Sequence, residues 1–565
     1  SILHIAAAHG WRGDALEPAA FGPPPAWEAQ EQRKSAGQPQ NGRSSADLQV
    51  MQAEQHDDSP DPEPSGGAPA PAAPPERRGV PQAKHLMTDQ ANANRLAKAF
   101  GAQILVAAGQ WYAWDGRRWA RDKSDVYRLA CRLSELVKDE ARGYAQRAAS
   151  PDTPGEEASK LADLSKALEK WSIKCEMRST LEAAVSLLHN MLTVDPALLD
   201  ADPWLLNCAN GVLDLRTGAL RAHDPGLLLT KLCPTAYDPS AKAPTFERVL
   251  AQITCEDMMP EDRREVAPFL LRWFGYCLTG DVREQVFVVH WGDGSNGKST
   301  LLDTIAGLAG DYACGAPAGL VAGKESKAGE REAVVFHGMR VVTAHETSDG
   351  PLREEFIKSV TGSDPITARY LYKEAFTFNP THKLQLLTNH KPGIRGQDHG
   401  IWRRVLLVPY QARFGSINDT ASGMATAVRD ETVMARLRAE RPGILAAVVR
   451  GCLAWQAGGL CPPTAVRAAV DAYRVEQDRI GQFVSECCEL DAGAWEPLTG
   501  GMGGGLYAAY QGWCREGGGM PTGKIRFLQE ITRAFPQVRT QEAKIPDEGR
   551  RRKILRVWGL KLLTE

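Results

Sequence analysis

The pattern of apolar and polar positions changes period along the chain and so indicates where helices and strands lie. An apolar run, Val286–Val289, predicts a buried strand, and the stretch Lys298–Leu308 after it has the spacing of a helix. Helical spacing recurs on both sides of this region. Helices are expected at residues 92–100, 126–148, 159–192, 246–278, 442–455, 466–487, 506–513 and 524–533. A strand–helix unit with helical flanks predicts an α/β fold.

Alternating apolar and polar residues around turn-forming residues predict hairpins. Trp111–Trp119 has this pattern, and a third hairpin is expected within Ile357–Phe378 with the polar tip Tyr372–Glu374. A second hairpin is expected at residues 210–221, and single strands at 339–344, 383–388, 405–408 and 550–558. Arg117 and Arg118 lie among the tryptophans of the first hairpin and could stack on single-stranded bases. Cross-strand packing of the aromatic side chains explains this pattern more simply.

One segment differs from the rest in composition. Residues 23–84 are rich in Pro, Gln, Ser, Ala and Gly, most extremely at Ser65–Pro75. A segment with so few apolar residues cannot bury enough surface to offset its chain entropy, so we expect a disordered linker. A linker joins two ordered parts. Residues 1–22, with a short helical stretch at Ile2–Trp11, are therefore expected to be the tail of a domain upstream of Ser1.

The overall composition is that of an ordinary soluble protein of three or four domains, with 43% hydrophobic and 24% charged residues. The net charge of −2 means that nucleic-acid binding would depend on local basic patches. The 12 cysteines contain no C-x-x-C pair, which argues against zinc and a disulfide framework and favours a reducing cytosol. No apolar run approaches the ~18 residues of a membrane span, and no signal peptide is visible. We expect no membrane partner.

The clearest chemistry follows the strand Val286–Val289. The nine residues are Gly292, Asp293, Gly294, Ser295, Asn296, Gly297, Lys298, Ser299 and Thr300, which fit the pattern G-x-x-x-x-G-K-[ST]. The glycines allow a tight turn that points successive N–H groups at an anion, and the helix after them adds its dipole. Lys298 would contact the β- and γ-phosphates, and the Ser299 hydroxyl would bind Mg²⁺. This pattern predicts binding of ATP with Mg²⁺; the alternative is a chance glycine-rich turn.

Four residues that an ATPase needs follow at the edges of later strands. Glu346 closes the strand 339–344 and would activate the attacking water and help to hold Mg²⁺. His345 occupies the position before it, which is usually acidic, and a solvated surface glutamate is the alternative for Glu346. Asn389 ends a buried strand and could bond the γ-phosphate or the water. Arg403 and Arg404 suit an arginine finger supplied across a subunit boundary, or else a simple salt-bridge pair.

The order of these motifs resembles superfamily 3 helicases and, more narrowly, the phage and plasmid primase–helicase family with its poxvirus-type and phage-type ATPases. The segments that carry the resemblance are the glycine-rich loop, 340–347, 361–369, 388–392, 402–404, and, earlier, 205–214 with 223–225. The last two resemble the helicase-associated region that precedes the ATPase in this family. The resemblance covers about residues 86–560, and five ordered motifs make it specific.

The resemblance implies a ring, usually a hexamer, that hydrolyses ATP between subunits and pulls single-stranded DNA through its channel. It implies an α/β, AAA+-like P-loop core with a mainly helical N-terminal domain and a C-terminal winged-helix-like module. Lys373 stands where this family has a DNA-gripping hairpin, and Arg369 is near the hairpin base. On the module, Arg550, Arg551 and Arg552 would contact DNA phosphates, although a solvated charge run is nearly as plausible.

The expected domains follow from these assignments. They are a helicase-associated domain at 85–245, the ATPase core at 246–412, a helical connector at 413–487 and the winged-helix-like DNA-binding module at 488–565. The predicted function is an ATP-dependent replicative DNA helicase of a phage, prophage or plasmid, acting in the bacterial cytosol. The alternative is an ATP-bound initiator that assembles on an origin without translocating. We do not credit primase activity to this chain.

Overall fold

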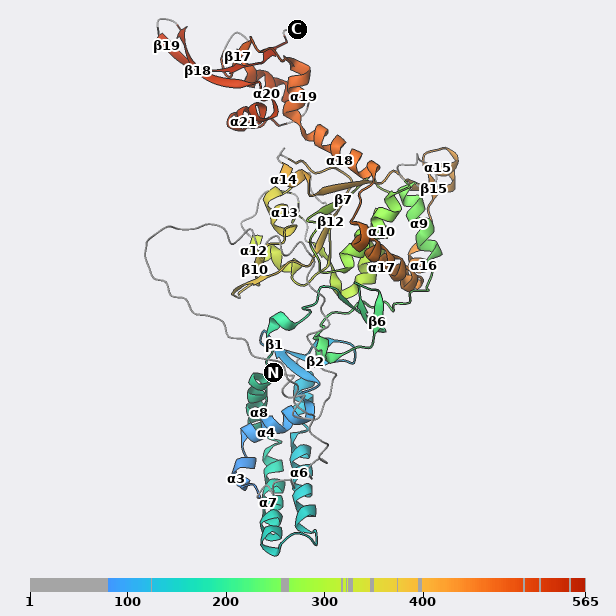
Figure 1. Ribbon diagram of the computed structural model, residues 1–565, viewed down its shortest axis with the longest axis vertical. Coiled ribbons are helices and arrows are strands. Elements are labelled where there is room, and N and C mark those ends of the chain that lie inside the picture. The colour runs from blue at the N-terminus through green and yellow to red at the C-terminus, as the bar shows by residue number, and fades with distance from the viewer. Residues whose placement is uncertain are drawn as a thin grey trace, which may run out of the picture. The chain divides into compact units, whose positions relative to one another are not determined.

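The computed structural model describes residues 80–122, 124–255, 264–316, 319–321, 323, 329–345, 350–372, 374–394, 399–500, 504–517, 520–547 and 550–563 (Figure 1). These residues fall into two compact units. The first takes the residues up to Trp111 and those from 124 to 194, and the second takes Tyr112–Asp122 and the residues from Asp195 onward. No helix in the described ranges combines the length and the apolar character that a bilayer crossing requires.

The first unit is mainly helical, as predicted. It contains α3 (Ala83–Leu86), α4 (Asp89–Phe100), β1 (Ile104–Ala107), α5 (Ser124–Ala130), α6 (Leu133–Ala148), α7 (Gly155–Lys174) and α8 (Arg178–Met191). Helices α6 and α7 lie side by side (Figure 1) and bury Val137 and Leu168. The single helices expected at 126–148 and 159–192 are each two helices. The backbone leaves the helical conformation at Arg132 (ψ 0°) and Met177 (ψ 139°), and a new helix begins after each.

The second unit begins with the two expected hairpins, which are confirmed. Their strands are β2 (Gln110–Trp114), β3 (Trp119–Arg121), β4 (Leu205–Cys208), β5 (Gly211–Asp214) and β6 (Ala219–Arg221). Trp114 lies opposite Trp119, with ring centroids 5.7 Å apart, as cross-strand packing predicts. Asn207 Nδ2 donates to the carbonyls of Arg117 and Lys231, each at 2.9 Å. Residues 195–245 therefore pack in this unit, whereas the sequence placed them in a domain beginning at residue 85.

The centre of the second unit is a parallel sheet of five described strands in the order β13-β7-β12-β9-β8. They are β7 (Phe287–Trp291), β8 (Ala313–Ala316), β9 (Val341–His345), β12 (Lys383–Thr388) and β13 (Val405–Pro409). The strands expected at 339–344, 383–388 and 405–408 are confirmed. Because Leu387 pairs with His345 and Thr388 with Trp291, the carboxyl ends of β7, β9 and β12 meet at one edge.

Helices pack against this sheet. One buried cluster with Val288 and Val408 is formed by α9 (Pro244–Thr254), α10 (Val266–Leu278), α11 (Lys298–Ala309), α16 (Val433–Ala439) and α17 (Arg441–Gly458). Helix α18 (Thr464–Gln477) places Tyr473 in the cluster that contains Phe287 and Val289. Helices α10 and α17 lie side by side (Figure 1) at a very close approach, since a Cβ on Gly275 would stand 2.2 Å from the Cys452 nitrogen. Only glycine fits there. The helix expected at 246–278 is thus α9 and α10, and residues 256–263 between them lie outside the described residues.

Smaller elements complete the core. They are α12 (Gly329–Glu332), α13 (Glu354–Val360), the hairpin of β10 (Ile366–Arg369) and β11 (Ala375–Phe378), α14 (His399–Trp402), β14 (Phe414–Gly415), α15 (Ile417–Ala421) and β15 (Ala427–Val428). The third expected hairpin is confirmed, but the residues from Ile357 to Val360 are helical. Glu354 and Glu355 in the first turn favour this helix through its dipole.

The C-terminal part has the helices and hairpin that the sequence predicts. They are α19 (Arg479–Cys487), β16 (Cys488–Glu489), β17 (Trp495–Pro497), α20 (Leu506–Glu516), α21 (Lys524–Ala534), β18 (Arg539–Asp547), β19 (Arg550–Trp558) and β20 (Lys561–Leu562). Phe483, Tyr510 and Phe527 form their buried core. The long helix expected at 466–487 is broken at Asp478, whose carboxylate accepts from the Gly481 nitrogen and caps α19.

Lys383 is a buried cation at the first position of β12. Its ammonium donates to the carbonyls of Thr279, Asp281 (3.2 Å) and Thr381 (3.0 Å), and lies 4.9 Å from the centre of the Tyr276 ring. Burial lowers the pKa of Lys383 to about 7. When Lys383 is protonated, neutral carbonyl oxygens and a ring face stabilise its charge.

This lowered pKa predicts a pH dependence of stability. Between pH 7 and the ordinary lysine pKa of about 10.4, the unfolded chain binds a proton that the folded chain lacks, so folding becomes more favourable as pH rises. Lys383→Met should remove this contribution. Between pH 7.5 and 9, the free energy of unfolding of the wild type should therefore rise by about 2 kcal/mol relative to that of the variant. Denaturant titration of both proteins measures this difference. Parallel pH profiles for the two proteins would contradict the prediction.

Candidate functional site

A glycine-rich loop joins β7 to α11 at the carboxyl edge of the sheet. Gly294 and Gly297 have φ angles of +97° and +78°, which side chains disfavour. A Cβ at Gly292 would lie 2.4 Å from both the Asn296 Nδ2 and the Tyr410 carbonyl oxygen. Both contacts are far shorter than van der Waals contact. The glycines of the sequence pattern are therefore required by the backbone of this loop.

Lys298 is the first residue of α11 and is buried beneath the loop. Its Nζ donates to the Gly292 carbonyl oxygen (2.6 Å) and to Asn389 Oδ1 (3.2 Å). Burial lowers the pKa of Lys298 to about 8, and the nearby Asp293 carboxylate offsets part of this effect. Both hydrogen-bond acceptors of this buried ammonium are neutral, so it retains a strong attraction for an anion.

Asn296 adds a second donor to the loop. Its side chain is buried, and Nδ2 has no hydrogen-bond partner within the part of the chain that the structure describes. A buried donor without a partner costs about 1–3 kcal/mol, which an oxygen of a bound ligand would recover. The glycine cradle, the buried ammonium and this donor together fit an oxyanion such as a phosphate group.

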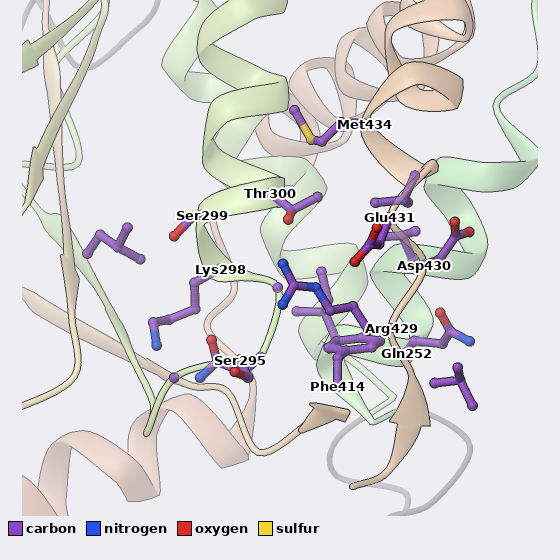
Figure 2. Close-up of a pocket in the computed structure, with 18 of the residues that line it drawn as sticks. Gln252, Ser295, Lys298, Ser299, Thr300, Phe414, Arg429, Asp430, Glu431 and Met434 are labelled. Carbon is purple, nitrogen blue, oxygen red and sulfur yellow. The ribbon is translucent and has the colours of Figure 1, made fainter. Parts of the chain in front are cut away.

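The loop opens into a cavity of about 1070 Å³ (Figure 2). From the sheet edge, the cavity is lined by Ser299 and Thr300 at the start of α11, by His345 at the end of β9, and by Thr388 and Asn389 at the end of β12. Asp293, within the loop, does not line the cavity. The structure thus brings together the loop, His345 and Asn389, which the sequence predicted separately.

The opposite wall of the cavity was not predicted from the sequence. It is built by α9, β14, β15, α16 and the segment between β15 and α16. Its residues are Arg248, Val249, Gln252, Ile253, Phe414, Val428, Arg429, Asp430, Glu431, Val433, Met434 and Arg436. Phe414 approaches the loop closely, because its backbone nitrogen donates to the Ser295 carbonyl at 2.7 Å. No motif marks these residues in the sequence, since they come from several separate segments.

Arg403 and Arg404 lie at the other end of the sheet. They immediately precede β13, whose first residue Val405 pairs with Phe287, the first residue of β7. The loop follows the last residue of β7, roughly 13 Å further along the strand. Arg403 Nη2 donates to Gln285 Oε1 at 3.4 Å, and Arg404 Nη1 donates to the Gly400 carbonyl at 2.8 Å. Neither arginine lines the cavity of its own chain.

The remaining predicted residues are placed as follows. Glu346 and Lys373 lie outside the described residues. Arg369 ends β10 and is exposed, away from the cavity lining. For Arg550–Arg552 the structure gives the backbone, which forms the start of β19, but not the side chains.

Two family models match separate parts of this chain. The model described as D5 N terminal like matches residues 93–255. A model described as a family of unknown function matches residues 290–404, which include the glycine-rich loop, His345, Asn389 and both Arg403 and Arg404. The second match includes β8, β9 and β12, whereas β13 and the cavity wall at Phe414 and 428–436 lie outside both matches.

Viral proteins are similar to this chain over longer stretches. A protein of Acanthamoeba polyphaga mimivirus named as a helicase is 24% identical over 404 residues, 67% of this chain and 41% of its own length. One of Frog virus 3, also named as a helicase, is 25% identical and aligns with 52% of this chain and 37% of its own length. One of African swine fever virus named as a primase is 24% identical and aligns with 37% of this chain and 22% of its own length.

Among solved structures, the apo C-terminal region of NrS-1 is similar, with 10% identity and a TM-score of 0.34 over 58% of this chain and 80% of that chain. This chain spans less than half the length of the viral relatives named above. The D5-like region, the matched sheet region and these relatives agree with the order of motifs in the sequence. Together the D5-like match and the viral relatives show that the chain is similar to phage and viral primase–helicases.

Proposed function

We propose that this chain is the helicase part of a replication primase–helicase, an ATP-driven ring that moves along single-stranded DNA. The observation that carries the proposal is the glycine-rich loop with the buried Lys298 between Gly292 and Asn389. The parallel sheet with this loop between β7 and α11 supports an AAA+-like P-loop core. The viral relatives named as helicases or a primase support an action on nucleic acids.

The proposed chemistry is hydrolysis of ATP, in which the protein positions groups and neutralises charge. Lys298 and Asn296 hold phosphate oxygens, and Asn389 orients the γ-phosphate or the attacking water. Mg²⁺ bound with ATP would draw charge from the β- and γ-phosphate oxygens, with the Ser299 hydroxyl as one ligand. Glu346 follows His345, which lines the cavity, and is our proposed base for the water.

The position of Arg403 supports assembly into a ring. An arginine that stabilises the transition state must reach the γ-phosphate, yet Arg403 stands at the opposite end of β7 from the loop in its own chain. It is exposed there, and among the described residues its side chain makes one long hydrogen bond, to Gln285. Such an arginine is available to the site of a neighbouring subunit. A closed ring repeats this head-to-tail contact around an axis, and we propose a hexamer.

Two surfaces support binding of DNA. The β10–β11 hairpin exposes Tyr372 (96%) at its tip, in the same hairpin as Arg369, and an aromatic ring so exposed is suited to stacking on bases. Lys373 is the next residue in the sequence. The second surface is the β18–β19 hairpin with α20 and α21. These elements would form a winged-helix-like module whose Arg550–Arg552 contact DNA phosphates.

The rival proposal is an initiator that binds ATP in order to assemble on an origin and does not translocate. It would use the same loop and the same C-terminal hairpin. It would not need DNA to change the rate of hydrolysis, and it could dispense with Glu346 and Arg403. The two proposals therefore differ in the coupling between DNA and ATP hydrolysis.

We expect single-stranded DNA to raise the rate of ATP hydrolysis of the wild type several-fold, and Lys373→Ala to lose this stimulation while keeping the basal rate. The reason is that a hairpin lysine would contact the DNA backbone and not ATP. The measurement is steady-state hydrolysis with and without single-stranded DNA, at fixed salt.

Lys242→Ala is the matched control, because Lys242 is an exposed lysine of the same unit away from the hairpin. It should be stimulated like the wild type. Hydrolysis that is indifferent to DNA in all three proteins would reject the translocating helicase and leave the initiator.

A further inference from the structure

Arg429 is an arginine on the cavity wall. Neither the glycine-rich loop motif nor the residues predicted to act with it assign it a role. It follows β15, lines the cavity and is exposed. Figure 2 shows its side chain reaching from the end of β15 toward the start of α11, where Lys298, Ser299 and Thr300 lie. Within the part of the chain that the structure describes, its guanidinium makes no ion pair and no hydrogen bond.

The neighbouring charges leave Arg429 without a counter-charge. Asp430, the next residue, forms an ion pair with Arg436 of α16. Glu431 lies on the same wall but forms no ion pair with Arg429. Arg248 of α9 adds a further positive charge to the lining. A guanidinium surrounded in this way is best satisfied by an anion that enters the cavity.

The backbone fixes Arg429 to the loop of its own chain. The Phe414 nitrogen donates to the Ser295 carbonyl at 2.7 Å, which joins β14 to the loop. Strand β15 pairs in parallel with β14, and the Arg429 nitrogen donates to the Gly415 carbonyl at 2.8 Å. Two backbone hydrogen bonds and one strand pairing thus separate Arg429 from the cradle. This connection lies entirely within one subunit.

We propose that Arg429 contacts the phosphates of the nucleotide bound in its own subunit, so that the site has an arginine supplied in cis in addition to one supplied in trans. This inference rests on the proposed binding of ATP in the cavity. It assigns to Arg429 a role that differs from that of Arg403, which reaches only a neighbouring site. A guanidinium on the β- or γ-phosphate would sense how many phosphates the nucleotide carries.

The test compares the affinities of the wild type, Arg429→Ala, Arg429→Lys and Arg413→Ala for a non-hydrolysable ATP analogue, ADP and AMP, measured by calorimetry. Arg429→Ala should bind the ATP analogue about 10- to 100-fold more weakly, which is the range for losing a charged hydrogen bond. The loss should be smaller for ADP and absent for AMP. Arg429→Lys should recover part of the affinity, because it keeps the charge but not the planar fork.

Arg413→Ala is the matched control, since Arg413 is an exposed arginine on the same segment that does not line the cavity. It should bind all three nucleotides like the wild type. Equal affinity of Arg429→Ala and the wild type for the ATP analogue would overturn the inference. An equal loss for AMP would also overturn it, because it would place Arg429 on the base, the ribose or the α-phosphate and not on the β- or γ-phosphate. If the wild type itself bound no nucleotide, the proposed function would fail and this inference with it.

A mixing experiment separates action in cis from action in trans. If Arg429 acts in cis, each site in a mixture of Lys298→Ala and Arg429→Ala subunits lacks either Lys298 or Arg429. Hydrolysis should then remain at the level of the separate variants. Recovery of hydrolysis on mixing would show that Arg429 serves a neighbouring subunit and would overturn the assignment.

Discussion

Lys298→Ala is expected to lower ATP hydrolysis by at least about a hundredfold, because an active site that loses one preorganised charged donor commonly loses that much rate. The structure adds a second expectation. In the protein without nucleotide, burial of the charged Lys298 side chain costs free energy, because burial lowers its pKa to about 8. Removing the ammonium should therefore leave the melting temperature unchanged or slightly raised, while nucleotide binding is lost.

Hydrolysis by purified protein and thermal melting with and without an ATP analogue measure these effects. The wild type should be stabilised by the analogue and Lys298→Ala should not. Lys242→Ala, at an exposed lysine of the same unit, should behave like the wild type in both assays. Hydrolysis by Lys298→Ala close to the wild-type rate would show that the glycine-rich loop is not the site of the reaction.

Arg403→Ala is expected to lower hydrolysis by roughly a thousandfold, the lower end of the effect of an arginine finger. Because Arg403 stands at the far end of β7 from the loop, the defect should belong to the neighbouring site and not to its own. Nucleotide affinity of the isolated subunit should stay at the wild-type value. This combination of lost turnover and kept binding distinguishes Arg403 from Lys298.

Mixing provides the decisive measurement for Arg403. Arg403→Ala subunits keep an intact loop, and Glu346→Gln subunits keep an intact arginine, so a mixture should recover part of the hydrolysis that neither variant has alone. Arg283→Ala is the control, since Arg283 is an exposed arginine that precedes the same strand β7 and pairs with Asp281. It should hydrolyse ATP like the wild type. No recovery in the mixture would contradict a shared site.

The sequence by itself determined the glycine-rich loop and the elements on either side of it. Gly292, Gly297 and Lys298 act within one short stretch, and a strand before them and a helix after them show in the local period of apolar residues. The hairpins and the strands β9, β12 and β13 were predictable for the same reason. Breaks in helices were less predictable, because a cap such as Asp478 ends a helix without changing its apolar spacing.

The tertiary structure alone decided which predicted residues share a site. Pairing of parallel strands brings Asn389 to Lys298, 91 positions earlier, and the same register sends Arg403 to the opposite end of the sheet. Phe414 and Arg429 reach the cavity through a strand pairing and two backbone hydrogen bonds that leave no periodic signal. Local patterns record the conformation of neighbouring residues, whereas a site is assembled by contacts between distant ones, and these depend on how the whole sheet is ordered.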